Sequence, residues 1–319
     1  MQARSPVPNA SDAGLPVVNS FTATVMRDVR EGKVYLYEDD ELFRAIEAIT
    51  IRFVRERAAD WFGIETGEAA GSLALLHQKL TRAQMAEIVR RAHTRRRDIA
   101  GIPLAVAKSI ARDGLADRTL VSFNEHLRLI PPDEAGKTSG VPAHRDSWYS
   151  LPKETVNVWM PCTRAPGVGL YPQFFGKRVS IGWREAATHH HKVKGIDFAN
   201  EPMLAPEVEP GRSLLFCGNQ LHRSRPNDSA VTRVSWDYRL LDVEGTSPSL
   251  RLHEFVFVDL LLQRPEEPQW FHAQTQARLR KTHRSLWMAR GLTGSRRPKL
   301  PFTKLGRTIK NALPGVFYG

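Results

Sequence analysis

The sequence predicts a mainly β fold with flanking helices, in the α+β class. Two observations support this prediction. Beyond position 120, polar and apolar residues alternate in short segments separated by turn-forming residues, which is the pattern of half-buried strands. Before that position, apolar residues recur at helical spacing. Several short strands at such intervals favour an antiparallel barrel or sandwich over a parallel α/β sheet.

Two amphipathic helices are expected in the N-terminal third. Asp39 and Asp40 offer an N-cap for the first helix, and Gly63 supplies its stop. Thr81 and Gln84 have the spacing of a capping box that opens the second helix. The apolar positions of the two helices are Leu42, Phe43, Ile46, Ile49, Phe53 and Val54, and then Met85, Ile88, Val89 and Ala92. We expect both helices to pack on the outside of the sheet, in a supporting role.

The strand-like segments start with residues 121–129, which alternate in the manner of a half-buried strand. A loop follows at 131–136, and the segment around His144 and Asp146 is expected to be the next strand. The remaining candidate strands cover residues 155–160, 213–216, 231–241 and 251–261.

Four polar residues in this region have a spacing that suits a metal site. Residues separated by one point to the same face of an extended strand, so His144 and Asp146 can converge on one point. If the fold brings His222 to that point, two imidazoles and one carboxylate leave three coordination positions open, as in non-heme Fe(II) oxygenases. Arg233 lies eleven residues beyond His222, which is enough for a turn and a return strand.

This set resembles the phytanoyl-CoA dioxygenase-like family of Fe(II)/2-oxoglutarate-dependent oxygenases. The family pattern is His-x-Asp, a long insert, a distal His with a following Pro-Asn, and an Arg about eleven residues later. His144, Asp146, His222 and Arg233 match this pattern one by one. The resemblance implies a double-stranded β-helix core, a cupin-like jelly roll, with helices flanking the major sheet.

The resemblance also implies roles for individual residues. It assigns His144, Asp146 and His222 as ligands of Fe(II), and Arg233 as the partner of the far carboxylate of the co-substrate 2-oxoglutarate. A guanidinium suits that task because it binds a carboxylate with two parallel hydrogen bonds. If Arg233 does not serve as this anchor, Arg239 is the next candidate. Three further residues are expected to line the co-substrate pocket: Trp159, Asn157 and Ser235.

The function that follows is a non-heme iron dioxygenase that hydroxylates an unactivated C–H bond of a small-molecule or lipid-like metabolite. The carboxylate of Asp146 argues against a halogenase, because halogenating relatives bind halide in its place. Two alternatives stay open. One is a jelly-roll binding protein without turnover, and the other is a protein that acts at a membrane or on an acidic partner through a basic tail.

That tail carries most of the net charge of the chain. The 319 residues include 46 basic and 34 acidic side chains, with no acidic residue beyond Glu267 and eleven basic ones from Arg278 onward. The rest of the chain is therefore nearly neutral. Apolar residues at near-helical spacing among these basic ones suit an amphipathic segment on an anionic membrane or an acidic partner. Nucleic acid is not expected, since no recognisable reading module accompanies the charge.

The domain prediction has three parts: residues 1–20 without fixed structure, an oxygenase domain at 21–265, and the basic tail at 266–319. No apolar run has the length needed to span a bilayer, and the first residues lack the apolar core of a secretory signal. We therefore expect a cytoplasmic protein, with peripheral membrane association as the alternative. Cys162 and Cys217 are expected to be free thiols.

Overall fold

The computed structural model describes most of the chain between residues 14 and 281. The described ranges are 14–67, 71–94, 101–122, 126–132, 141–149, 151–179, 200–243 and 255–265, together with 193, 196–198, 274–275, 277–279 and 281. The chain divides into two units, Met1–Arg278 and Leu279–Gly319. Every element below belongs to the first unit. Within the described residues, no helix is both long and apolar enough to cross a membrane.

The larger of two sheets has eight strands among the described residues. In spatial order, seven of them are β1 (Val17–Val18), β2 (Tyr35–Glu38), β7 (Arg212–Cys217), β5 (Val156–Pro161), β9 (Arg233–Asp242), β3 (Thr119–Ser122) and β10 (Phe255–Phe257). The eighth, β4 (His126–Ile130), pairs with the first half of β9. All pairings are antiparallel except that of β1 with β2.

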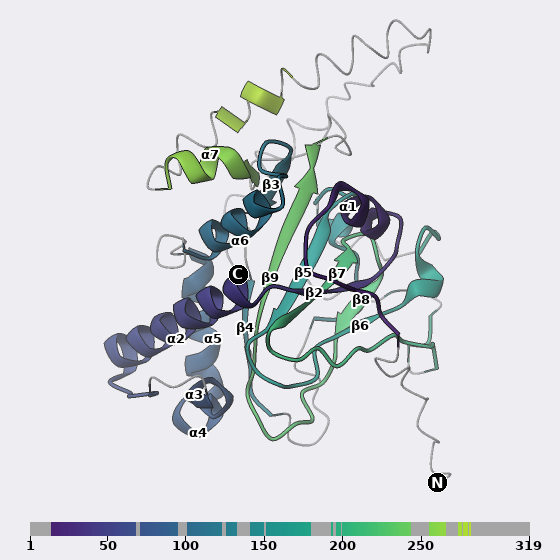
Figure 1. Ribbon diagram of the computed structural model, residues 1–319. Coiled ribbons are helices and arrows are strands. Elements are labelled where there is room, and N and C mark those ends of the chain that lie inside the picture. The colour runs from purple at the N-terminus through teal and green to yellow at the C-terminus, as the bar shows by residue number, and fades with distance from the viewer. Residues whose placement is uncertain are drawn as a thin grey trace, which may run out of the picture. The chain divides into compact units, whose positions relative to one another are not determined.

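The smaller sheet pairs β6 (Val168–Leu170) with β8 (His222–Ser224). Single bridges extend it on both sides, from His222 to His144 and from Leu170 to Leu204. Figure 1 shows the helical layer on one face of the large sheet and β6 and β8 on the other. Two facing antiparallel sheets with helices outside the larger one confirm the predicted jelly-roll core and its flanking helices.

The helices are mostly found before β3. They are α1 (Ala23–Arg30), α2 (Asp40–Phe62), α3 (Gly71–Ala74), α4 (Leu76–Lys79), α5 (Arg82–Thr94), α6 (Gly101–Arg112) and, near the end of the described region, α7 (Val258–Gln263). Two short 3-10 turns cover Asp146–Tyr149 and Pro172–Phe174.

Both predicted helix starts are confirmed. The side chain of Asp39 accepts a hydrogen bond from the Leu42 amide, and α2 ends at Gly63 in the left-handed conformation with φ of 66°. Thr81 and Gln84 form the reciprocal capping box at the start of α5. These caps fix the residue at which each helix begins. The buried apolar residues of α2 and α5 belong to the same core cluster as apolar residues of the large sheet.

Strand β9 separates the core from the interior between the sheets. Its even-numbered residues Val234, Trp236, Tyr238 and Leu240 are fully buried in the cluster that also contains the apolar faces of α2, α5 and α6. Its odd-numbered residues therefore point to the opposite face, toward the small sheet. A second apolar cluster lies on that side and includes Trp159, Leu170 and Phe216.

The structure corrects three strand predictions. The described residues of the candidate strand at 121–129 belong to two strands, β3 and β4, because the long strand β9 pairs with each of them along a different half. In the candidate strand at 251–261, the described residues form the short β10 and then the first turn of α7. The expected strand through His144 and Asp146 has His144 in a single bridge, and Asp146 begins a 3-10 turn.

A short strand lies near the N-terminus, and an ion pair lies at the start of the basic tail. Val17–Val18 forms a short strand inside the stretch where the sequence predicts no fixed structure. The first basic residue of the tail, Arg278, pairs with Asp259 at 2.6 Å, so a partner on the first unit neutralises its charge. Residues 282–319 lie outside the described residues, and the membrane or acidic partner of the tail stays a prediction. Both cysteines are buried free thiols.

Candidate metal centre

The two histidines are placed by a short stretch of backbone pairing. The amide of His144 donates to the carbonyl of His222 at 2.8 Å, and the amide of His222 donates back at 2.9 Å. This reciprocal pair puts both side chains on the inner face of the small sheet, where their ring centroids are 4.2 Å apart. Residues 78 positions apart in the chain are thus joined by two backbone hydrogen bonds.

The carboxylate joins them because the chain turns immediately after His144. The amide of Asp146 donates to the Gly218 carbonyl at 2.9 Å, which starts the 3-10 turn and directs the side chain inward. The Oδ1 atom of Asp146 then lies 3.4 Å from Nε2 of His144 and 3.6 Å from Nε2 of His222. These three buried residues form a group whose candidate ligand atoms all lie within 4.8 Å of one another.

Hydrogen bonds to the backbone fix the tautomer of each imidazole. The Nδ1 atom of His144 lies 2.7 Å from the carbonyl of Pro142, and Nδ1 of His222 lies 2.8 Å from the carbonyl of Gln220. A carbonyl oxygen only accepts, so each Nδ1 donates, and each Nε2 is the ring atom that faces Asp146. This arrangement is typical of histidines that bind a metal ion.

The second oxygen of the carboxylate is held from the large sheet. Asn157 on β5 and Arg239 on β9 are directly opposite in the ladder, and each donates to Oδ2 of Asp146 at 2.8 Å. With Oδ2 occupied by two donors, Oδ1 is the oxygen that faces the imidazoles. The Asp146–Arg239 ion pair is buried, so little solvent screens it.

The charge states suit a metal ligand set. Burial alone would raise the pKa of the Asp146 carboxyl, but Arg239 and the two histidines hold it well below its ordinary value. Burial, with His144 close by, lowers the pKa of His222 to about 3. At neutral pH the carboxylate is therefore ionised and His222 is a neutral base, which are the forms that bind metal ions.

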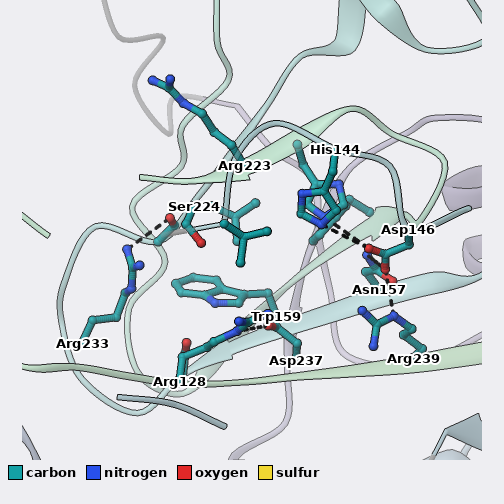
Figure 2. A pocket seen from close by; sticks show the side chains of 16 residues that line it. Arg128, His144, Asp146, Asn157, Trp159, Arg223, Ser224, Arg233, Asp237 and Arg239 are labelled. Carbon is teal, nitrogen blue, oxygen red and sulfur yellow. Dashed lines mark hydrogen bonds and ion pairs between the residues drawn. The ribbon is translucent and has the colours of Figure 1, made fainter. Parts of the chain in front are cut away.

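A cavity between the two sheets continues from this group along β9. Its described lining includes the polar side chains of Ser235 and Asp237 and four guanidinium-bearing residues: Arg128, Arg223, Arg233 and Arg239. Figure 2 shows Asp146 and Arg239 at one end of this cavity and Arg233 at the other, with Trp159 between them in that view.

Arg233 lies at the far end of the cavity from Asp146 and is buried. Its Nη1 donates to the carbonyls of Pro166, Gly167 and Arg225, the last at 2.9 Å. Among the described residues, no acceptor contacts its Nη2. Burial, with the charge of Arg128 nearby, lowers the pKa of Arg233 to about 10, which leaves the guanidinium charged at neutral pH.

The other residues assigned to the co-substrate pocket also line this cavity. Trp159 packs against Gly167 so closely that a Cβ on that glycine would lie 2.1 Å from Cη2 of the indole. Ser235 is fully buried, and its Oγ has no hydrogen-bond partner among the described residues. Asn157 lines the cavity as well, but its amide nitrogen is used to hold Asp146.

Two structural roles were missed from the sequence. Arg239, considered there as a substitute anchor, instead pairs with Asp146. The amide of the fully buried Asn227 donates to the carbonyls of Ile130 and Val231, so it fastens the turn between β8 and β9 to the neighbouring strand. For Arg239, the available signal was the alternation in β9, where polar residues at odd positions follow buried apolar ones at even positions.

This chain has limited similarity to known proteins. No family model matches the chain. The chain is 32% identical over 130 residues to the 1-deoxypentalenic acid 11-beta-hydroxylase of Streptomyces arenae, and this match covers 36% of the chain and 46% of the relative. The chain thus spans less than half the length of the curated relative that it matches.

Among solved structures, the chain is similar to the non-heme alpha ketoglutarate dependent carbocyclase SnoK from nogalamycin biosynthesis. The identity is 17% over 70% of this chain and 85% of that chain, with a TM-score of 0.37. EvdO2 from Micromonospora carbonacea var. aurantiaca complexed with 2-oxoglutarate is 11% identical over 72% of this chain and 94% of that chain, with a TM-score of 0.40. Similarities of this size carry no weight for the function, which rests on the site itself.

Proposed function

We propose that this protein is an Fe(II)- and 2-oxoglutarate-dependent dioxygenase that hydroxylates an unactivated C–H bond of a small-molecule or lipid-like metabolite. The observation that carries the proposal is the group formed by His144, Asp146 and His222. We place the chain nearest to the phytanoyl-CoA dioxygenase-like branch of these enzymes, because the spacing of its four motif residues follows that pattern.

The ligand set fits Fe(II) on the chemistry of its donor atoms. Two imidazole nitrogens and one carboxylate oxygen on the same side of an ion are the set found in non-heme Fe(II) oxygenases. Two ligand atoms that would each lie about 2.1 Å from one metal ion are at most about 4.2 Å apart. The distances of 3.4 and 3.6 Å from Asp146 Oδ1 to the two Nε2 atoms are within this limit.

The remaining cavity fits a molecule that chelates the ion and ends in a carboxylate. Arg233 stands at the end of the cavity away from Asp146, with Nη2 free of acceptors among the described residues. The unpartnered hydroxyl of the buried Ser235 lies on the same strand, two residues away. A dicarboxylate such as 2-oxoglutarate supplies acceptors for both, which removes the cost of leaving them unsatisfied.

The chain itself has three tasks in the reaction. His144, Asp146 and His222 hold the ion, while Asn157 and Arg239 keep the carboxylate in one orientation. Arg233 orients the co-substrate, and Trp159 and Phe216 line the cavity and exclude water. When bound, iron and 2-oxoglutarate together with dioxygen supply an oxidant strong enough to attack an unactivated C–H bond.

The relative from Streptomyces arenae supports hydroxylation as the outcome, because it is named an 11-beta-hydroxylase of an acid. The test is conversion of 2-oxoglutarate to succinate by the purified full chain with Fe(II), first alone and then with a panel of small carboxylic acids and lipid-like metabolites. We expect slow succinate formation without a metabolite and faster formation with a substrate. A wild-type protein that binds Fe(II) and 2-oxoglutarate but forms no succinate under any condition would favour the alternative of a binding protein.

A further inference from the structure

A second guanidinium shares the cavity with Arg233. Arg128 on β4 is directly opposite Ser235 on β9, and directly opposed residues of an antiparallel pair point to the same face. Arg233 and Asp237 lie two residues to either side of Ser235, so they share that face as well. The side chains of all four residues therefore line the cavity together.

The hydrogen bonds of Arg128 leave most of its donors unused. Its Nε donates to Oδ2 of Asp237 at 3.0 Å, and the two side chains are 31% and 24% exposed. Among the described residues, neither Nη atom of Arg128 has an acceptor. Asp237 thus holds the guanidinium by one edge, and the other edge is available to a ligand.

The charges around Ser235 do not balance without a further anion. Arg128 and Arg233 bring two positive charges, and Asp237 supplies one negative charge. The two guanidiniums are near enough that Arg128 contributes to the lowered pKa of Arg233. One carboxylate would neutralise the surplus, and it would also accept from the orphaned hydroxyl of Ser235.

We propose that Arg128 is a second carboxylate-binding residue, which together with Arg233 and Ser235 binds the far carboxylate of 2-oxoglutarate and selects diacids over 2-oxo monoacids. This inference rests on the proposed function and deepens it. Asp237 is a positioning residue, because it holds Arg128 through Nε and does not itself accept from the co-substrate. The co-substrate carboxylate is then held by two cations and one hydroxyl.

The experiment compares a diacid with a monoacid in calorimetric titrations. Full-length protein loaded with Zn(II), which does not turn over, is titrated with 2-oxoglutarate and separately with pyruvate, which lacks the far carboxylate. In Arg128→Gln, we expect the Kd for 2-oxoglutarate to rise by about 10- to 100-fold, as for loss of a hydrogen bond between charged groups. The Kd for pyruvate should stay within about twofold, and Arg128→Lys should restore part of the affinity for 2-oxoglutarate.

The matched control is Arg212→Gln, because Arg212 also pairs through Nε with a carboxylate on a neighbouring strand, Glu38, at 2.5 Å. It should leave both titrations unchanged, since neither residue lines the cavity. Unchanged affinity for 2-oxoglutarate in Arg128→Gln would overturn the inference and leave the proposed function standing. Equal weakening for both acids would also overturn it, since it would indicate a structural role for Arg128. If wild-type protein binds the metal but neither acid, the proposed function itself fails.

Discussion

The two ends of the cavity differ in whether their polar groups already have hydrogen-bond partners. At the metal end, the groups that do not face the centre already have partners: both Nδ1 atoms donate to carbonyls, and Oδ2 of Asp146 accepts from two donors. At the other end, the hydroxyl of Ser235 has no partner among the described residues, and the cavity lining has Asp237, which pairs with Arg128, against the two charges of Arg128 and Arg233. The metal end is therefore suited to bind a cation. The end at Arg233 and Arg128, the arginine end, is suited to bind an anion.

This difference shows which parts of the site are preorganised. Three electron-rich atoms held close together repel one another until a cation binds, so the metal end needs a rigid frame. Strands β5 and β9 and the reciprocal pair between His144 and His222 supply that frame. A carboxylate can adjust its own orientation when it enters, so the arginine end requires less prior order. Four substitutions, from the largest expected effect to the smallest, test this comparison.

The largest effect is expected from Asp146→Ala. It removes the anionic ligand and breaks a buried ion pair, so we expect no stoichiometric Fe(II) and a loss of about 3–5 kcal/mol in the free energy of unfolding. Metal analysis and thermal unfolding measure the two effects. Asp242→Asn is the matched control, because Asp242 is also buried and pairs with Arg118 at 2.8 Å outside the cavity lining. A variant that loses stability but keeps its iron would contradict the role of Asp146.

Arg233→Ala tests the arginine end alone. Removing the partner of a desolvated carboxylate should weaken 2-oxoglutarate binding by about 2–5 kcal/mol, while the iron content stays at the wild-type level. Arg233→Lys should restore only part of the affinity, because an ammonium group does not form two parallel hydrogen bonds. Calorimetry on Zn(II)-loaded protein measures both. Loss of iron together with 2-oxoglutarate would show that the two ends are not independent.

Arg239→Gln is the corresponding change in the frame of the metal end. It removes the charge that holds Oδ2 of Asp146 but leaves Asn157 and all three candidate ligands in place. We expect the affinity for Fe(II) or Zn(II) to fall about 10- to 100-fold, as for other residues that orient metal ligands. Arg118→Gln serves as the control for loss of a guanidinium paired with a buried aspartate. Equal metal affinity in Arg239→Gln and wild type would mean that Asp146 needs no support from β9.

The smallest effect is expected at Gly167, which lines the cavity beside Arg233. A methyl group at Gly167 would lie 2.1 Å from the Trp159 indole, so Gly167→Ala forces the ring or the backbone to move. Overpacking of this kind costs about 1–3 kcal/mol of stability. The shift should also weaken 2-oxoglutarate binding slightly, because the Gly167 carbonyl contacts Arg233. Gly71→Ala, which meets open space, should change neither the melting temperature nor the titration appreciably.

The sequence predicted the parts of this site that depend on local pattern. Alternation placed β5, β7 and β9, the caps placed α2 and α5, and motif spacing singled out His144, Asp146, His222 and Arg233. The helix and strand periods are local properties of the chain, so they can be read without knowing the fold.

The parts that the sequence did not predict depend on which strands become neighbours. Arg239 was considered as a carboxylate anchor, but the β5–β9 register sets it opposite Asn157 and beside Asp146. Arg128 attracted no attention, because only the β4–β9 register brings it to Ser235. The turn at Asp146 was missed for the same reason, since a hydrogen bond to the distant Gly218 starts it. Pairings between distant residues are not visible in a single sequence.

The most direct test of the central claim is whether the cation and the dianion bind together. 2-Oxoglutarate is titrated under anaerobic conditions into the full chain with and without one equivalent of Fe(II), and into Asp146→Ala treated in the same way. If the co-substrate bridges the metal and Arg233, wild type should bind it much more tightly with Fe(II) than without, and the variant should show no such difference. Equal affinity with and without the metal in wild type would contradict the account.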